Sequence, residues 1–192
     1  CKDLGVQYLT VYAFSTENWK RPADEVSTIM GLLKQYMIEA IDSMERDQIR
    51  LRFLGDLSTI SPELQALIEK TNEISSHIEG FQADVCLNYG GRDEILRAAR
   101  AFARDCADGK ASPEALTEEG FGHYLYSDGI PDPDLIIRPS GELRLSNFLL
   151  WQCAYAEFYF CDTLWPDFDE RALDAAIIDY QKRDRRFGGV KA

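Results

Sequence analysis

The chain has 192 residues, of which 45% are hydrophobic, and it carries 21 lysine and arginine residues against 33 aspartate and glutamate residues. A chain of this length can bury one sizeable core, and no Pro/Gly/Ser-rich linker divides it, so we expect a single domain over residues 1–192. The net charge of −12 argues against a nucleic-acid partner bound through a broad basic face. The basic residues must therefore act locally, at individual sites.

The cysteine count and the hydropathy pattern indicate a cytoplasmic protein. Five cysteines form no C-x-x-C pair, which predicts free thiols in a reducing compartment, and a zinc site is not expected because only His77 and His123 are available. No apolar run approaches the roughly 18 residues of a membrane span, and no signal peptide opens the chain. Because Cys1 leads straight into a strand-like segment, we expect a missing segment upstream.

Strands and helices alternate along the sequence. Apolar residues in the segment 24–46 are spaced by three and four, so one face of the predicted helix is apolar along its whole length. Ser61 and Pro62 supply a capping hydroxyl and a first-turn proline for the next helix. The alternation predicts an α/β fold with a mainly parallel central sheet flanked by helices. The predicted strands are 6–14, 49–54, 83–87 and 135–137, followed by an aromatic segment, 155–160, and the predicted helices are 24–46, 61–75, 93–106, a short one from Thr117, 147–152 and 169–183.

Basic and hydroxyl side chains follow the strand predicted at 135–137. Ligands of open α/β sheets collect beyond the carboxyl ends of parallel strands, so Arg138 and Arg144 are expected to face a ligand crevice. Their guanidinium groups would bind phosphate through paired hydrogen bonds. Alternatively, this is a surface loop whose arginines pair with neighbours such as Glu142, and these residues alone leave both interpretations open. Ser140, Ser146 and the backbone of Gly141 are candidates for shorter-range donors.

Polar clusters follow three of the predicted strands, at 15–21, 88–92 and 138–147. Each cluster taken alone is better explained by a helix cap, a turn or core packing. Because the carboxyl ends of parallel strands meet at one edge of a sheet, the three together favour a site. The sequence contains no G-x-x-x-x-G-K-[ST], G-x-G-x-x-G, G-x-S-x-G or H-E-x-x-H motif, so the usual nucleotide-binding, hydrolase and zinc-protease classes lose support.

Glu157 interrupts a run of large apolar residues, where burial of a carboxylate is costly unless a cation or a donor meets it. Its partner could be an arginine such as Arg144, in a salt bridge, or Mg²⁺ beside phosphate oxygens. The apolar face of the segment 24–46 also allows two interpretations. It could be ordinary core, or it could line a pocket for an apolar chain.

Six motifs follow one another over essentially all 192 residues: YAFSTENWKRP (12–22), NYGGR (88–92), IRPSGELRLSNFLLWQ (137–152), YAE (155–157), LWPD (164–167) and RRFGG (185–189). Taken together, they closely resemble the cis-prenyltransferases, of the type of bacterial undecaprenyl diphosphate synthase. The resemblance implies a homodimeric α/β transferase that uses Mg²⁺ to add isopentenyl diphosphate units to farnesyl diphosphate, with one cis double bond formed at each addition. The product would be a long polyprenyl diphosphate, of undecaprenyl type, that serves as a lipid carrier for cell-wall sugars. The enzyme would be cytoplasmic, with transient membrane association for product delivery and no transmembrane segment.

The resemblance also implies roles for individual residues. The diphosphate of isopentenyl diphosphate would be bound by Arg138, Arg144 and Ser146, and Glu157 would help to hold Mg²⁺. Residues 185–189 would reach the partner subunit's phosphate site. Four residues would lie between the two substrates: Ser15, Asn18, Trp19 and Arg21. Of these, Ser15 and Asn18 are the candidates for proton removal, and Arg21 would contact a phosphate group. Elements of the depth of an apolar tunnel would be Met30, Leu33 and Phe81.

One part of the family pattern is absent. The opening Asp-Gly-Asn-Gly-Arg-Trp segment, which carries the catalytic aspartate and the allylic diphosphate loop, does not occur in residues 1–192. An alternative function is therefore a non-catalytic partner subunit of a prenyltransferase complex, and a third is a phosphate-ligand binding module without chemistry. Retention of Asn18, Arg138 and Glu157 favours the enzyme.

Overall fold

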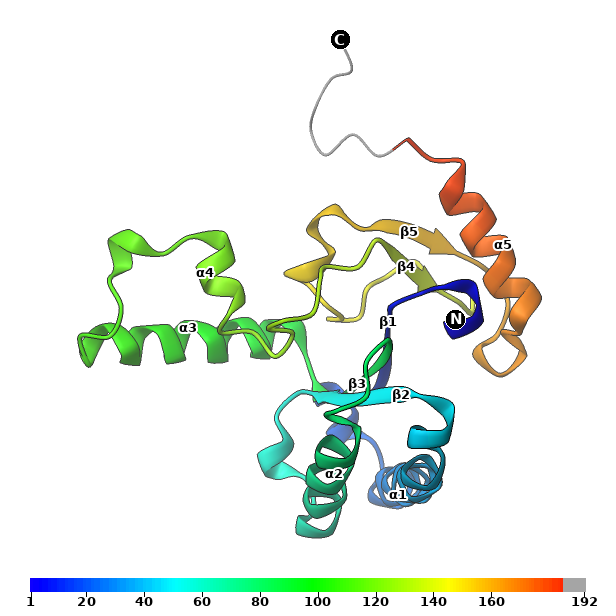
Figure 1. The fold of residues 1–192 in the computed structure, drawn as a ribbon, viewed down its shortest axis with the longest axis horizontal. Helices are drawn as coiled ribbons and strands as arrows, with labels where there is room; N and C mark the ends of the chain where they lie inside the picture. Colours follow the sequence, from blue (N-terminus) through cyan, green and yellow to red (C-terminus); the bar gives the residue numbers. More distant parts are fainter. Residues whose placement is uncertain (185–192) are drawn as a thin grey trace. The chain divides into compact units, whose positions relative to one another are not determined.

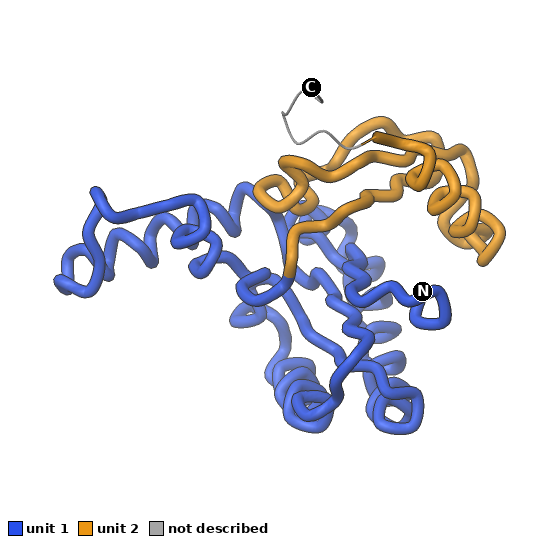
Figure 2. Tube along the Cα trace, turned by 45° about the horizontal axis from the view of Figure 1, so that its top comes forward, with its two compact units in different colours: residues 1–130 blue, residues 131–192 orange. Residues whose placement is uncertain are grey.

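Three parallel strands form the sheet of the N-terminal part of the chain. The computed structural model describes residues 1–184, and contacts between residues group the chain into two units, 1–130 and 131–192 (Figure 2). In the first unit the strand order is β1 (Tyr8–Ser15), β3 (Phe81–Tyr89) and β2 (Ile49–Leu54), and all pairs are parallel. The three strands predicted there are confirmed.

Two helices connect the parallel strands, as the sequence predicted: α1 (Ala23–Asp47) and α2 (Pro62–Ser75) (Figure 1). The Oγ of Ser61 caps α2 by accepting a hydrogen bond from the backbone N–H of Leu64, with Pro62 in the first turn. The core between the helices and the sheet contains Phe14, Met37, Phe53, Ile60, Leu64, Ile68 and Leu87.

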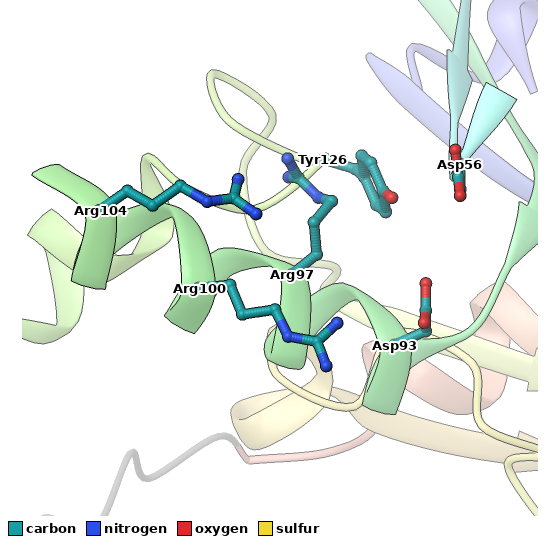
Figure 3. A pocket seen from close by; sticks show the side chains of 6 residues that line it. All are labelled: Asp56, Asp93, Arg97, Arg100, Arg104 and Tyr126. Carbon is teal, nitrogen blue, oxygen red and sulfur yellow. The ribbon is translucent and has the colours of Figure 1, made fainter. Parts of the chain in front are cut away.

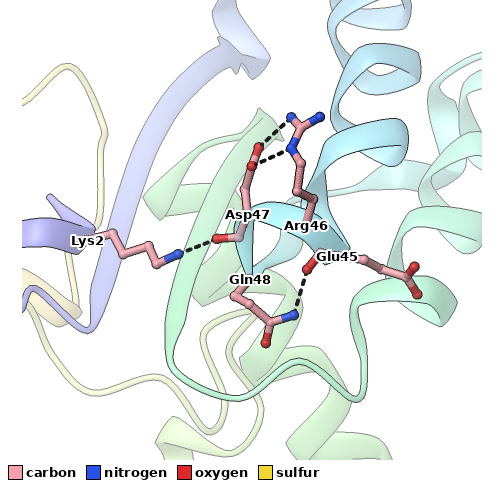
Figure 4. A network of polar contacts seen from close by, with 5 residues as sticks. All are labelled: Lys2, Glu45, Arg46, Asp47 and Gln48. Carbon is pink, nitrogen blue, oxygen red and sulfur yellow. Dashed lines mark hydrogen bonds and ion pairs between the residues drawn. The ribbon is translucent and has the colours of Figure 1, made fainter.

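A polar network marks the end of α1 (Figure 4). Gln48 follows the helix in the left-handed conformation, with φ of 51°, and its side-chain amide donates to the carbonyl oxygen of Glu45 over 2.6 Å. Arg46 forms an ion pair with Asp47, and Lys2 donates to the carbonyl oxygen of Asp47. The first turn of the chain is thereby attached to the end of α1.

The first unit ends in a helical arm made of α3 (Gly91–Ala107) and α4 (Glu118–Gly122) (Figure 1). α3 begins directly after β3. The short helix predicted from Thr117 is confirmed, and the Oγ1 of Thr117 caps it by accepting from the N–H of Gly120. Tyr124, just beyond α4, donates its hydroxyl to Asp105 of α3 over 2.9 Å, which holds the two helices together.

The second unit contains a two-stranded parallel sheet and one α-helix. β4 (Leu135–Arg138) pairs with β5 (Glu157–Phe160) in register, residue for residue. Asp169 caps α5 (Glu170–Gln181) by accepting from the N–H of Ala172 over 3.0 Å. The α/β class and the parallel pairing are confirmed, with the described strands divided between two sheets. Short 3-10 helices lie at Lys2–Leu4, Thr16–Lys20, Leu57–Thr59, Pro113–Ala115, Gln152–Tyr155 and Trp165–Asp167.

The helix predicted over 147–152 is wrong. Ser146, Asn147 and Leu149 have φ values of 51°, 64° and 44°, which a right-handed helix cannot contain. A single 3-10 turn, Gln152–Tyr155, follows this irregular segment instead.

Two further sequence predictions concern the whole described chain. All five cysteines are free thiols, as predicted, and Cys86 and Cys153 are buried. None of the helices within residues 1–184 combines the length and the apolar character that crossing a bilayer requires. The predicted partner-contact segment, 185–189, lies outside the described residues.

Candidate active site

Asn88 connects the carboxyl ends of the three strands in the first unit. It lies near the end of β3, is 5% exposed, and has φ of 47°. Its side-chain nitrogen donates to the carbonyl oxygen of Asp56 over 2.7 Å and to the hydroxyl of Thr59 over 2.8 Å, both just beyond β2. Its side-chain oxygen accepts from the indole N–H of Trp19, beyond β1, over 2.7 Å. The polar clusters at 15–21 and 88–92 therefore meet at one edge of the sheet, as predicted, whereas the third cluster, 138–147, follows β4 of the separate two-stranded sheet.

Gly55 makes this close approach of β2 and β3 possible. Its φ is 138°, and a Cβ atom at this position would lie 2.0 Å from the carbonyl oxygen of Leu87. Asp56 donates its backbone N–H to the carbonyl oxygen of Asn88 over 3.2 Å. Only glycine fits between the two backbones without a shift of the strands.

The predicted catalytic residues lie in the turn that follows β1. Ser15 ends the strand, and its backbone N–H donates to the side-chain oxygen of Asn18 over 2.8 Å. Trp19 is 42% exposed and packs edge-on against Phe14, with ring centroids 5.0 Å apart. Arg21 forms an exposed ion pair with Glu25 over 2.7 Å. The structure therefore brings Ser15, Asn18 and Trp19 into one turn and places Arg21 at its end.

A shallow depression lies over this edge of the sheet. Trp19 and Asn88 line it together with Thr16, Asp56, Thr59 and Asp93. Thr16 belongs to the predicted cluster at 15–21, but sequence reasoning missed Asp56, Thr59 and Asp93 as site candidates. The Gly55-Asp56 pair that closes β2 was the available signal, because it repeats the pattern of polar residues directly after a strand.

The residues of the predicted anion site lie in the second unit. Arg138 is the last residue of β4, and its Nε is buried without a hydrogen-bond partner in residues 1–184. A buried guanidinium nitrogen without an acceptor is costly, so this atom is suited to a ligand that brings its own oxygen.

The loop after Arg138 has an unusual backbone. Ser140 and Gly141 have φ values of 70° and 66°, and Ser146 and Asn147 also have positive φ. Ser140 donates its N–H to the carbonyl of Thr163, and Gly141 donates to the carbonyl of Cys161 over 2.9 Å. The proposed role of the Gly141 backbone as an anion donor is therefore wrong, because that N–H already has a partner within the protein. Strained backbone of this kind is often found at ligand sites.

Arg144 and Ser146 lie exposed on the same loop. Arg144 forms an ion pair with Glu142, as the surface-loop alternative predicted, and the arginine side chain is 64% exposed. The pair leaves most of the guanidinium donors of Arg144 open to solvent.

Glu157 forms a salt bridge, but its partner is Arg183 rather than Arg144. The Oε2 of Glu157 accepts from Arg183 over 2.8 Å, and both side chains are about one-third exposed. The hydrogen bonds of Arg183 to Glu157 and then to Asp179 raise the pKa of the guanidinium group. Within residues 1–184, no group of three or more His, Cys, Asp and Glu side chains could hold a metal ion. Glu157 fits Mg²⁺ as one carboxylate ligand, through the oxygen that Arg183 does not use.

The apolar face of α1 is partly buried. Met37 lies in the core, while Met30 and Leu33 are half-buried against it. Leu32 and Tyr36, on the opposite side of the helix, are 48% and 63% exposed. This packing is compatible with both interpretations of the face, as ordinary core and as a wall that binds an apolar chain.

The sequence matches one family model over residues 1–188, the Prenyltransf family of undecaprenyl diphosphate synthases. The chain belongs to this family. Curated relatives agree: the isoprenyl transferase of Clostridium perfringens is 51% identical over 191 residues, which cover 100% of this chain and 76% of the relative. The isoprenyl transferase of Streptococcus thermophilus is 50% identical, over 97% of this chain and 77% of the relative.

Two solved structures have the same fold. Lavandulyl diphosphate synthase from Lavandula x intermedia, in complex with dimethylallyl diphosphate, has a TM-score of 0.94 and 35% identity, over 97% of this chain and 81% of that chain. A probable undecaprenyl diphosphate synthase from Campylobacter jejuni has a TM-score of 0.86 and 39% identity, over 98% and 86%. The predicted family is therefore confirmed, and with it the assignment of the chain as a cis-prenyltransferase enzyme.

Proposed function

We propose that this protein adds isopentenyl diphosphate units to farnesyl diphosphate, with a cis double bond at each addition, and makes a polyprenyl diphosphate of undecaprenyl length. The observation that carries this proposal is the buried, unpartnered Nε of Arg138 at the carboxyl end of β4. Family membership supports an isoprenyl diphosphate as the ligand that supplies the missing acceptor.

In this proposal, Arg138, Arg144 and Ser146 bind the diphosphate of isopentenyl diphosphate, and Arg21 contacts a phosphate group. For Arg144 this means exchanging the carboxylate of Glu142 for phosphate oxygens. For Arg21 it means exchanging the carboxylate of Glu25 for phosphate oxygens. Both exchanges are inexpensive, because exposed ion pairs contribute little to stability.

The turn after β1 would serve the reacting end of the substrates. The allylic diphosphate ionises, the isopentenyl double bond attacks the carbocation, and a proton is then lost. Ser15 and Asn18 are the proposed groups for proton removal. The Ser15 N–H bond to Asn18 keeps the Asn18 amide in one orientation, and Trp19 excludes water from the cation.

We propose Mg²⁺ as the metal cofactor and Glu157 as one of its ligands. When bound, Mg²⁺ supplies positive charge where the departing diphosphate becomes negative. Arg183 holds the carboxylate of Glu157 in place through one oxygen and leaves the other available.

We further propose that one catalytic domain spans the whole chain, that the protein forms a homodimer and that it delivers its product to a membrane. Large exposed apolar side chains in the second unit, such as Tyr155 and Trp165, each 65% exposed, support a covered surface in the homodimer.

The proposal is tested with the full-length protein, radiolabelled isopentenyl diphosphate, farnesyl diphosphate and Mg²⁺. We expect butanol-extractable long-chain products that decrease when the metal is removed with EDTA. Absence of products from the protein alone, with activity only after a second family member is added, would identify the non-catalytic partner subunit instead.

A further inference from the structure

Three arginines lie along one side of α3, outside the candidate active site. Arg97, Arg100 and Arg104 are spaced by three and four residues, so successive turns of the helix bring them close together. Figure 3 shows Arg97 and Arg104 extending over the same side of α3 towards Tyr126, with Arg100 on the flank of the helix.

Arg97 is held in a fixed position. Its guanidinium carbon lies 4.0 Å from the centre of the Tyr126 ring, and it donates to the carbonyl of Tyr124 over 2.6 Å. The backbone N–H of Tyr126 is in turn bonded to the fully buried carboxylate of Glu94 over 2.8 Å. Burial raises the pKa of Tyr126 to about 12, so its ring stays neutral beneath the arginine. A ligand would therefore meet a guanidinium that is already oriented.

The side chains of Arg100 and Arg104 form no ion pair or hydrogen bond within residues 1–184. This is unexpected in a chain with 33 acidic and 21 basic residues. Other arginines of the protein, such as Arg46 and Arg183, pair with carboxylates nearby. The arginine side of α3 thus presents positive charge that the described protein leaves unneutralised.

The three arginines line a pocket of about 170 Å³ together with Tyr126, Asp56 and Asp93. The two carboxylates lie at the end where α3 begins, away from Arg104 (Figure 3). One of them, Asp56, is already engaged, because its Oδ1 accepts from the N–H and hydroxyl of Ser58. An anion would therefore bind at the arginine end, and Asp93 would weaken its binding.

We propose that Arg97, Arg100 and Arg104 form an anion site for phosphate groups. Guanidinium groups bind phosphate oxygens through paired hydrogen bonds, and a pocket of this volume accommodates a diphosphate. Two sources of the same chemistry are available: free inorganic diphosphate, and the phosphodiester headgroup of an anionic lipid. The pocket shares Asp56 and Asp93 with the depression over the sheet edge, but none of the three arginines is assigned to the prenyltransferase reaction, so the proposal does not depend on that assignment.

The first test measures binding of inorganic diphosphate by calorimetry in EDTA. The Arg138→Ala/Arg144→Ala variant of the full-length protein serves as background and removes the other proposed phosphate site. Adding Arg100→Gln/Arg104→Gln should raise Kd at least ~10-fold. The fold should be unaffected, because neither side chain has a partner to lose. Asp93→Asn should lower Kd. A matched control, Arg171→Gln/Lys182→Gln, removes the same charge from α5 and the residue that follows it and should leave Kd unchanged.

The second test distinguishes the lipid source. Vesicles of phosphatidylcholine, with and without phosphatidylglycerol, are sedimented with the same variants. Loss of phosphatidylglycerol-dependent binding in Arg100→Gln/Arg104→Gln would identify a lipid headgroup, and loss of diphosphate binding alone would identify the free anion. Equal diphosphate and vesicle binding by this variant and the control would overturn the proposal. So would a change confined to the oligomeric state, which would assign the arginines to contacts between copies of the chain.

Discussion

Trp19 donates its indole N–H to the buried side-chain oxygen of Asn88, 69 positions away in the sequence, over 2.7 Å. Asn88 also donates both hydrogens of its side-chain amide, to the carbonyl of Asp56 and to the hydroxyl of Thr59. The position of the Trp19 ring, which we propose to bind substrate, therefore depends on Asn88. Asn88 connects the ends of all three strands, and we assign it no contact with the substrate.

Asn88→Asp tests this dependence. Aspartate keeps an oxygen for Trp19 but loses both donated hydrogen bonds, and it places a charge at a site that is 5% exposed. We expect kcat/KM for farnesyl diphosphate to fall at least ~10-fold and the indole ¹H–¹⁵N resonance of Trp19 to shift. Thr59→Ala removes one of the two donations and should have a smaller effect on both. An unshifted indole resonance in Asn88→Asp would contradict the positioning role.

The predicted anion site is tested at its two arginines. Arg138→Ala and Arg144→Ala should each lower kcat/KM for isopentenyl diphosphate at least ~10-fold through loss of a charge-assisted contact. Glu142→Gln is the matched variant, because it releases Arg144 from its ion pair and should lower KM slightly. Unchanged steady-state kinetics in both alanine variants would remove these arginines from the site.

Some parts of the fold and of the candidate site could be predicted from the sequence and others could not, for physical reasons. Local signals were sufficient where one residue determines the backbone, as with the helix caps Ser61 and Asp169. The loop from Ser140 to Leu149 could not be predicted, because its positive φ values at non-glycine residues are imposed by contacts such as Ser140 to Thr163. The partner of Glu157 was missed for a related reason. Arg183 lies 26 residues away, and only the packing of α5 brings it near β5.

Glu157→Gln separates the metal role from the structural one. Glutamine keeps the shape but loses the charge, so we expect a higher Mg²⁺ concentration for half-maximal activity. Asp179→Asn is the control, because it removes the other carboxylate partner of Arg183 and leaves Glu157 ionised. If both variants required the wild-type Mg²⁺ concentration, Glu157 would serve only to bind Arg183.

We predict that the free energy of unfolding depends on pH through the buried carboxyl group of Asp84. Its side chain is fully buried in β3, where Gln82 donates to Oδ1 over 2.7 Å and Oδ2 has no partner within residues 1–184. Burial raises the pKa of this carboxyl group above its ordinary value, although the Gln82 hydrogen bond opposes the rise. The stabilisation by protonated Asp84 is therefore complete below about pH 4 and is lost as the pH rises through the folded-state pKa.

Asp84→Asn keeps the acceptor for Gln82 and cannot ionise. We expect it to raise the free energy of unfolding at pH 7 by roughly 1–3 kcal/mol. In urea titrations this gain should shrink as the pH falls through the folded-state pKa of Asp84 and should be smallest below about pH 4, where wild-type Asp84 is protonated in both states. A gain that is the same at pH 7 and pH 3 would show that ionisation of Asp84 is not its cause.

The apolar face of α1 gives a prediction about product length. Leu33 is half-buried against the core cluster, next to the buried Met37. If this face lines the tunnel for the growing chain, elongation stops when the chain meets the closed end, so Leu33→Trp should shift the products towards shorter prenyl diphosphates. If the face is only core, the larger side chain forces strain of roughly 1–3 kcal/mol and lowers stability without changing product length.

The neighbouring Leu32 supplies the matched control, because it is 48% exposed and Leu32→Trp adds the same volume on the outer side of the same helix turn. The chain-length distribution is measured for wild type and both variants at equal concentrations of folded protein. Shorter products from Leu33→Trp, with wild-type products from Leu32→Trp, would place the tunnel wall on the inner face of α1. Wild-type products from a less stable Leu33→Trp enzyme would assign that face to the core, because overpacking would then have only its structural effect.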